Sequence, residues 1–312
     1  VINTLEILLE SQSQVTTLDL LKALPAESIY LDLDALLQAA SRWRNELTRQ
    51  QELVLNLRKL PRKKIPNDQE ALGKKLQETY SQSFPLKATH RPNPLILEIW
   101  RPSQSTIKRS SWVVLMPGLG GNQDHFRWLA RQLGSRGWSV VVLEHPGSDA
   151  KAVKDLLEGI SLAPGAEVLP GRLKDLYAVL EAQKKGILKV QGQDLVLIGH
   201  SLGSLTAYLS AGATPEKGLE ERCQKALADL SLTNLSQLLQ CQLKNVNLPM
   251  KQEIPQLKAI VGINSFGSLL WPSVGSAEIS VPVFLTGGTY DLITPALSEQ
   301  LGLILSSESN PL

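Results

Sequence analysis

A serine flanked by glycines is the strongest chemical signal in the sequence. The run Gly199-His200-Ser201-Leu202-Gly203 matches G-x-S-x-G, directly follows the apolar run 195–198 and precedes a helix-like run over 205–209. A strand, a tight turn and a helix form the context in which such a serine is held strained and exposed as a nucleophile. The helix start would also place partial positive charge beside a developing oxyanion. We therefore predict that Ser201 is a catalytic nucleophile; a glycine-rich structural turn is the alternative.

A second glycine-rich loop, at residues 116–121, ends the apolar run 112–116 and precedes a helical stretch. In a fold with a serine elbow downstream, this loop supplies the second N–H of an oxyanion hole. The predicted donors are the backbone N–H groups of Leu119 and Leu202, with Gly118 and Gly120 lining the substrate site. A phosphate cradle is the alternative. However, no Gly-Lys-Ser/Thr follows the loop, and the G-x-G-x-x-G spacing is absent.

Asp291 is the candidate for the acid of a catalytic triad. It follows the apolar run 281–286 and the glycine pair at 287–288. The triad order in α/β-hydrolases is serine, then acid, then histidine, so Asp291 stands where the acid belongs. Its role would be to fix the tautomer of the histidine and to stabilise the imidazolium. The alternative is a turn or N-cap aspartate before a helix that begins near Pro295.

The histidine of the triad has no obvious place in the sequence. The four histidines are His90, His125, His145 and His200. None follows Asp291, and a polar role outside the chemistry is the expectation for all four. His200 precedes the nucleophile, and His125 starts the helix after the glycine-rich loop, so both are expected beside the substrate. One more strand and a histidine loop should follow Leu312, so we expect a truncated C-terminus and little activity from the chain as given.

The elements that would position these residues alternate along the second part of the chain. Short apolar runs lie at 95–100, 112–116, 138–143, 195–198, 259–263 and 281–286. Helical stretches lie between them, for example at 125–136 and 173–184. Strands that are apolar along their whole length, alternating with helices, indicate a mostly parallel sheet covered on both faces. We therefore predict an α/β class fold of the α/β-hydrolase type.

The distribution of glycine divides the chain. Only Gly73 falls within the first 88 residues, which are rich in Leu, Gln, Glu and Lys. We expect a helical N-terminal region over 1–60, with a short helix at 16–22, an extended piece at 29–31 and an amphipathic helix from Leu33. A proline-punctuated linker is expected over 61–88, and the α/β domain over 89–312. An insertion at about 212–255 is expected to cap the pocket.

Composition excludes several classes of protein. The 312 residues carry a formal net charge of +2, so there is no electrostatic case for nucleic-acid binding. No apolar run approaches the roughly 20 residues that span a bilayer. The chain starts at Val1 without a signal-peptide pattern, so location cannot be inferred from this segment. Cys223 and Cys241 are the only cysteines, compatible with one disulfide or with two free thiols.

One stretch resembles a known group of proteins. The run Glu144-His145-Pro146-Gly147-Ser148-Asp149, together with the loop at 117–121 and the serine elbow, is similar to the dienelactone-hydrolase-like α/β-hydrolases of bacteria. These are related to platelet-activating-factor acetylhydrolases. Residues 18–25 and 28–33 resemble the end of the helical N-terminal domain, of unknown function, that a chiefly cyanobacterial family adds.

The resemblance implies a secreted or periplasmic hydrolase of carboxylic esters that needs no cofactor. The acid of that family lies in a Gly-x-x-Asp turn before proline, which corresponds to Asp291. In platelet-activating-factor acetylhydrolases proper the acid follows the preceding strand, and here that place is near Asn264, which cannot act as a carboxylate. Cysteines similar to Cys223 and Cys241 occur in the family, which favours the disulfide.

The predicted activity is therefore ester hydrolysis through an acyl-enzyme on Ser201. Acyl transfer to another acceptor by the same site is one alternative, and a non-catalytic binding or scaffold protein is another. The insertion is rich in leucine, which favours an apolar acyl group in a small-molecule ester; a small core of its own is the competing explanation. Its leucines are Leu230, Leu232, Leu235, Leu238 and Leu239.

Overall fold

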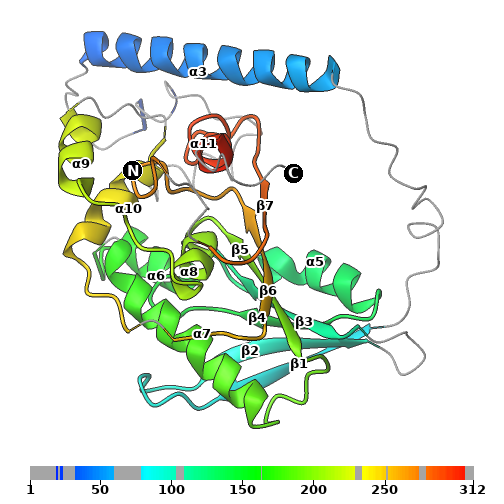
Figure 1. The fold of residues 1–312 in the computed structure, drawn as a ribbon. Helices are drawn as coiled ribbons and strands as arrows, with labels where there is room; N and C mark the ends of the chain where they lie inside the picture. The colour runs from blue at the N-terminus through cyan, green and yellow to red at the C-terminus, as the bar shows by residue number, and fades with distance from the viewer. Residues whose placement is uncertain are drawn as a thin grey trace.

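The computed structural model describes most of the chain (Figure 1). The described residues are 32–59, 79–102, 109–162, 164–228, 234–250, 252–273 and 279–305, with Asp19, Lys22 and Ala23. The predicted helix at 16–22 is described only at Asp19 and Lys22, and the extended piece at 29–31 lies outside the described residues. Among the described residues we find no helix that has both the length and the apolar character to cross a bilayer.

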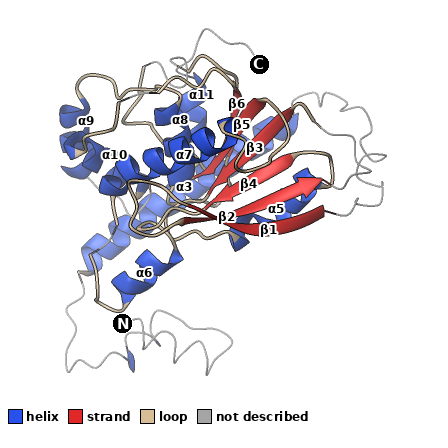
Figure 2. Ribbon diagram, turned by 90° about the horizontal axis from the view of Figure 1, so that it is seen from below, coloured by secondary structure: helices blue, strands red, loops and turns tan. Residues whose placement is uncertain are grey.

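A seven-stranded sheet organises the fold (Figure 2). Its strands are β1 (Thr79–Leu86), β2 (Leu95–Pro102), β3 (Ser111–Met116), β4 (Ser139–Leu143), β5 (Asp194–His200), β6 (Leu257–Ile263) and β7 (Val283–Thr286). Their order is β1-β2-β4-β3-β5-β6-β7. Only β2 runs against its neighbours; β4, β3, β5, β6 and β7 pair in parallel. The predicted mostly parallel sheet is confirmed.

Helices cover both faces of the sheet, which explains why its central strands are apolar along their length. Alternate side chains of β3 and β4 pack with Phe126 and Ala130 of α5 (Asp124–Gly134). The other set packs with α7 (Leu169–Lys184) and α8 (Leu202–Ser210). Figure 1 shows α7 and α8 on one side of the strands and α5 on the other. All six predicted strands are confirmed, with small shifts of their ends.

The predicted linker over 61–88 is wrong in its last part, because β1 begins at Thr79. Among the described strands it pairs only with β2, at the edge of the sheet, and most of its side chains are exposed. A polar edge strand shows no alternation of apolar and polar residues, so its sequence reads as a connector. The sheet therefore starts at residue 79, whereas the first predicted strand starts at residue 95.

The amphipathic helix predicted from Leu33 is present as α3 (Leu33–Lys59), and Figure 1 shows it lying outside the layers of the sheet. Its apolar residues Leu33, Leu37 and Trp43 are exposed. The remaining helical elements are α6 (Ala150–Leu157), η1 (Ala166–Val168), α9 (Leu219–Ala228), α10 (Ser236–Gln242), η2 (Leu243–Asn245) and α11 (Gln300–Leu305).

The predicted insertion holds α9, α10 and η2, and a disulfide joins its two helices. Cys223 and Cys241 are bonded, with a Cα–Cα distance of 5.5 Å. Leu219 and both cysteines belong to the main core, and Leu239 packs against it, so these described parts of the insertion share the main core. Leu238 is exposed, whereas Leu230 and Leu232 lie outside the described residues.

Reducing this disulfide is expected to lower the free energy of unfolding by about 3 kcal/mol, because it closes a loop with a sequence separation of 18 residues. Urea unfolding with and without a phosphine reductant measures the difference. The double variant Cys223→Ala/Cys241→Ala is the matched control and should not respond to the reductant. Equal urea midpoints for the oxidised and reduced wild-type protein would contradict the prediction.

Candidate active site

Ser201 sits in a strained turn between β5 and α8. It is the N-cap residue of α8, with φ 50° and ψ −116°, and it is half-buried. Few residues other than glycine adopt a positive φ, so the surrounding bonds must hold this conformation. The Ser201 N–H donates to Ile263 O at 2.8 Å, and the Ser201 carbonyl accepts from the N–H groups of Ser204 and Leu205. The turn is thus tied both to β6 and to its own helix.

The two glycines of the elbow are required by space. A Cβ added at Gly199 would lie 2.3 Å from the backbone nitrogen of Ser204. A Cβ added at Gly203 would lie 2.0 Å from Met116 O. Both contacts involve backbone atoms, which cannot move aside as a flexible side chain can. The glycines therefore allow the start of α8 to pack closely against β5 and against the end of β3.

The loop after β3 lies against the elbow. A Cβ added at Gly118 would be 3.1 Å from Ser201 Cβ, so the loop passes beside the serine side chain. The Gly120 N–H donates to Ser148 O at 2.9 Å, and the Gly121 N–H donates to Gly118 O at 3.2 Å. Within the described part of the chain, the N–H groups of Leu119 and Leu202 donate to no acceptor. Two unbonded N–H groups flanking a serine are what an oxyanion hole requires.

Asp291 lies in the loop after β7, where four hydrogen bonds hold its carboxylate. Oδ1 accepts from the N–H groups of Ile293 and Thr294, at 2.8 and 2.9 Å. Oδ2 accepts from Thr294 Oγ1 at 2.6 Å and from Asn264 Nδ2. Burial alone would raise the pKa of Asp291, but the bonds from Thr294, Asn264 and Ile293 lower it below its ordinary value. Asp291 is therefore ionised at neutral pH and also holds its own turn together.

Asn264 directly follows β6, at the alternative acid position that the family resemblance implies, and its side chain donates to the carboxylate of Asp291. Asn264 has φ 48°, and its N–H donates to Thr286 O at 2.8 Å. The ends of β6 and β7 therefore place the two alternative acid positions side by side. Of the two, only Asp291, in the loop after β7, carries a carboxylate.

His200 and His125 lie near this group of residues. A Cβ added at Gly118 would be 2.9 Å from His200 Nδ1, and one added at Gly121 would be 3.3 Å from His125 Nδ1. Burial lowers the pKa of His200, the nearby Asp291 carboxylate opposes that shift, and His125 adds to it. Within the described residues, no histidine is hydrogen-bonded to Ser201 or to Asp291. These residues likewise contain no cluster of side chains suited to a metal ion.

No protein-family model and no curated protein matches the sequence. Solved structures are similar in fold. One is the acylaminoacyl peptidase of Pyrococcus horikoshii, at 11% identity and a TM-score of 0.46 over 77% of this chain and 36% of the peptidase. Another is a candidate dienelactone hydrolase from Klebsiella pneumoniae subsp. pneumoniae, at 17% identity and a TM-score of 0.47 over 75% of this chain and 82% of that protein. The chain thus spans 36% of the length of the peptidase.

At these identities a likeness concerns the fold alone, and the topology of the chain makes the assignment. A mostly parallel sheet in the order given above, with β2 reversed, carries a serine elbow between β5 and α8. The fold is that of the α/β-hydrolases. In this fold the loops after β3, β5 and β7 meet at the carboxyl edge of the sheet, which is where Leu119, Ser201 and Asp291 lie.

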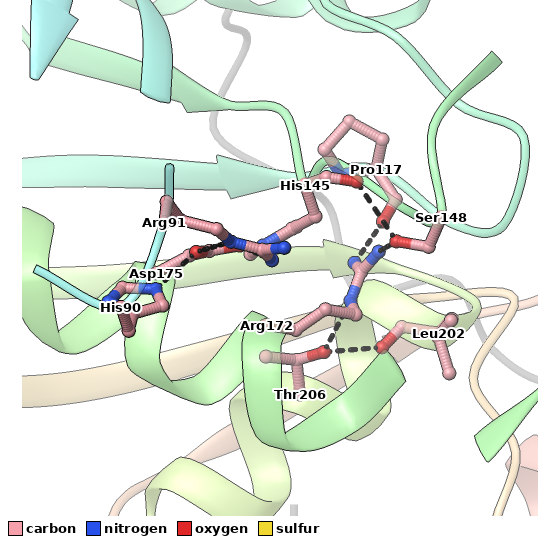
Figure 3. Close-up of polar contacts among 9 residues, drawn as sticks. All are labelled: His90, Arg91, Pro117, His145, Ser148, Arg172, Asp175, Leu202 and Thr206. Atoms are coloured by element: carbon pink, nitrogen blue, oxygen red, sulfur yellow. Dashed lines mark hydrogen bonds and ion pairs between the residues drawn. The ribbon is translucent and has the colours of Figure 1, made fainter. Parts of the chain in front are cut away.

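The α/β-hydrolase core also holds a buried network of charged residues that the sequence did not indicate (Figure 3). Asp175 of α7 is fully buried and bonds His90, Arg91 and His145, at 2.7, 2.7 and 3.0 Å. Burial alone would raise the pKa of Asp175, but the bonds from His145, Arg91 and His90 lower it. Two of the four histidines are thus structural. His145 stands in the run 144–149, but nothing in that run indicates its partner, because residues 90, 145 and 175 meet only in the fold.

His145 should make the stability of the protein sensitive to acid. Burial, reinforced by the charge of Arg172, lowers the pKa of its imidazole to about 3. As pH falls from about 6.5 to about 3, the unfolded chain binds a proton that the folded chain does not, so stability falls. The loss is at most about 1.4 kcal/mol per pH unit for this one group. The lowered pKa of Asp175 has the same effect below about pH 4, where the unfolded chain binds a proton at this carboxylate before the folded chain does, so stability falls further.

Urea midpoints measured between pH 7 and 4.5 report this loss. His145→Asn keeps a donor toward Asp175 but does not titrate in this range, so its stability should change less with pH than that of the wild type. A His145→Asn variant with the same pH dependence as the wild type would refute the assignment of the loss to His145.

The insertion lies directly beside the loop after β7 that contains Asp291. The N–H groups of Asn234 and Ser236 donate to the carbonyls of Leu292 and Ile293, at 2.6 and 3.0 Å. Buried Glu299 reinforces the contact, because it accepts from Asn234 Nδ2 at 2.6 Å and from Gly267 N at 2.8 Å. The start of α10, the loop after β6 and the loop after β7 are therefore held together next to Asp291.

Proposed function

We propose that this protein is a serine hydrolase that cleaves carboxylic esters through an acyl-enzyme. The observation that carries the proposal is Ser201, a non-glycine residue at φ 50° that lies against the loop at Gly118, while the N–H groups of Leu119 and Leu202, each next in the chain to Gly118 or Ser201, bond no acceptor among the described residues. A strained, half-exposed hydroxyl beside two free donors suits attack on a carbonyl carbon. A structural turn needs neither the strain nor the free donors.

The reaction proceeds in two halves. Ser201 Oγ attacks the ester carbonyl as a general base takes its proton, and the carbonyl oxygen becomes an oxyanion held by the Leu119 and Leu202 N–H groups. The tetrahedral intermediate collapses, and the alcohol leaves with the proton from the base. Water then attacks the acyl-enzyme in the same way and releases the carboxylic acid, which restores the serine.

Asp291 is proposed as the acid that orients the base. Its support is its place after β7, its ionised state and its influence on the pKa of His200 across the site. Three of its four hydrogen bonds come from its own loop and hold the carboxylate rigid. Because a carboxylate has about four acceptor positions, a histidine that it orients takes the place of one of its present donors. The fold's chain order puts the histidine after the acid, whereas all four histidines here precede Asp291.

The substrate is proposed to be a small ester with an apolar acyl group. The insertion borders the acid loop and exposes Leu238. The disulfide between Cys223 and Cys241 supports an oxidising compartment such as the periplasm or the cell exterior.

Labelling with a biotinylated fluorophosphonate tests the proposal. We expect a single adduct, on the peptide that contains Ser201, and no adduct with Ser201→Ala or with urea-unfolded protein. Absence of any adduct on the natural full-length protein would contradict the enzyme proposal and favour a binding or scaffold role. Product analysis with added alcohol separates hydrolysis from acyl transfer.

The same reagent identifies the base. We expect slow labelling of the chain of 312 residues, because no described histidine is bonded to Ser201. Fast labelling that is lost in His125→Gln or in His200→Gln would instead assign the base to that histidine. Because His90 and His145 bind Asp175, His90→Gln is the matched control and should leave the labelling rate unchanged.

A further inference from the structure

Arg172 of α7 is a buried cation that lies directly behind the serine elbow. Its side chain is 1% exposed, and its guanidinium makes three hydrogen bonds (Figure 3). Nε donates to Thr206 Oγ1 at 3.0 Å, one terminal nitrogen donates to Ser148 Oγ at 2.7 Å, and the other donates to Pro117 O. All three acceptors are uncharged oxygens, and each comes from a different segment of the chain.

Two of these bonds hold the loop that carries Leu119. Pro117 O belongs to the peptide group directly before Gly118, so its bond to Arg172 sets the orientation in which the loop leaves β3. Ser148 is the second anchor, since its carbonyl accepts from the Gly120 N–H at 2.9 Å. The guanidinium therefore holds the loop on both sides of Leu119: it bonds Pro117 O directly, and it bonds Ser148, which in turn bonds the Gly120 N–H.

The third bond holds the helix that carries Leu202. Thr206 Oγ1 accepts from Arg172 Nε and donates to Leu202 O at 2.8 Å. This closes a link from the guanidinium to the first residue of α8, whose N–H is the second donor of the proposed oxyanion hole. The relative position of the two donors thus depends on one side chain that touches neither.

The chemical nature of the anchor supports a role beyond packing. Burying a cation without an adjacent carboxylate is costly. None of the ion pairs among the described residues includes Arg172, although Asp175 lies in the neighbouring network. Burial lowers the pKa of Arg172 to about 9, so the group remains charged at neutral pH. A rigid planar fork can bind three oxygens in fixed directions, which neither lysine nor an apolar side chain can do.

We propose that Arg172 is a positioning residue that sets the distance and orientation between the two halves of the oxyanion hole, the Leu119 N–H and the Leu202 N–H. The proposal rests on the proposed function for its catalytic consequence. Its structural consequence, that both segments loosen when Arg172 is lost, does not depend on that function.

Kinetics with p-nitrophenyl acetate on the natural full-length protein test the catalytic consequence. Arg172→Met is expected to lower kcat by about 10²-fold, comparable with the loss of an oxyanion donor. Thr206→Val releases α8 from Arg172, and Ser148→Ala releases the loop that carries Leu119. Each should lower kcat by about tenfold. KM should change by less than about twofold, because the donors act on the transition state and not on the bound ester. Adding Thr206→Val to Arg172→Met should have little further effect.

Tyr208→Phe is the matched control. It removes another buried hydroxyl of α8, which bonds Ser265 Oγ at 2.8 Å and has no link to Arg172. Its kcat should equal that of the wild type even if the protein melts at a lower temperature. A kcat loss in Tyr208→Phe as large as that in Thr206→Val would show that general loosening of α8 is the cause, and would overturn the proposal.

Amide hydrogen exchange supplies the readout that does not need activity. In Arg172→Met the amides of Gly120 and Gly121, and those of Ser204 and Leu205, should exchange at least about tenfold faster, with β4 as the unchanged reference. Ser148→Ala should affect only the loop, and Thr206→Val only the helix. Unchanged exchange in both segments of Arg172→Met overturns the proposal, and so does an unchanged kcat.

If Arg172→Met does not fold, Thr206→Val and Ser148→Ala decide the question by the same two measurements. Hydrolysis that persists in Ser201→Ala would overturn the proposed function instead. The exchange experiment would then still decide whether Arg172 holds the two segments.

Discussion

Ser201→Ala is expected to lower kcat for p-nitrophenyl acetate by about 10³-fold or more in the natural full-length protein. The reason is that no acyl-enzyme can form without the hydroxyl, and only binding and the oxyanion donors remain to accelerate attack by water. The folded structure should hardly change, because the alanine can keep the backbone bonds from Ser201 N to Ile263 O and from Ser204 N to the carbonyl of residue 201.

The matched control for this prediction is Ser210→Ala. Ser210 is a buried serine at the other end of α8, and its Oγ donates only to Ala207 O, at 2.8 Å. The same substitution on the same helix should leave kcat within about twofold, since a local serine bond contributes little to stability or geometry. Undiminished hydrolysis by Ser201→Ala, measured beside this control, would show that the nucleophile lies elsewhere.

Asp291→Asn is the second substitution with a large expected effect, a fall in kcat of about 10³- to 10⁴-fold. An amide has nearly the size of a carboxylate but cannot stabilise an imidazolium. The variant should also lose some stability, because Asp291 accepts bonds from Thr294, Ile293 and Asn264 in its ionised form. Thermal unfolding therefore accompanies the kinetics, and rates are compared at a temperature at which both proteins are folded.

The contact between Asn264 and Asp291 offers a rescue experiment. In Asn264→Asp/Asp291→Asn the carboxylate and the amide exchange places across the same hydrogen bond. If a negative charge at this point is what matters, the kcat of the double variant should be at least about tenfold higher than that of Asp291→Asn. If Asp291 only holds its turn, Asp291→Asn should lose stability while its kcat stays within about twofold of the wild type, and the exchange should restore nothing.

The acid sensitivity of the fold bears on both experiments. The folded state loses stability through His145 as the pH falls below about 6.5, and through Asp175 below about pH 4. Activity profiles taken at low pH would therefore mix unfolding with titration of the site. Kinetic comparisons between variants are therefore best made near neutral pH, where Asp291 is ionised and the buried network is intact.

The sequence alone was sufficient to predict six of the seven strands, their mostly parallel pairing and the elbow. Strands buried on both faces are apolar throughout, so β3, β4 and β5 stand out as runs, and the helices between them require parallel pairing. The elbow could be predicted because its glycines meet a local requirement: backbone atoms approach Gly199 and Gly203 too closely for a side chain to fit. The disulfide between Cys223 and Cys241 followed from family resemblance, and the structure confirms it.

The pattern of apolar and polar residues did not predict features that depend on contacts with distant parts of the chain. Strand β1 lies at a solvated edge, so its polar sequence resembled a linker. Helix α3 is amphipathic, yet its apolar face is exposed, because a pattern states which side is apolar and not what will cover it.

Only the tertiary structure decided the surroundings of Ser201. Asn264 and Asp291 are 27 positions apart but share a hydrogen bond, because β6 and β7 end side by side. Arg172, Thr206, Ser148 and Pro117 meet behind the elbow although they come from four separate segments. Burial makes such contacts strong and their loss expensive, and burial depends on the packing of the whole chain. The sequence thus indicated which residue we propose as the nucleophile, and the fold determined which residues hold Ser201 and the loop and helix beside it in place.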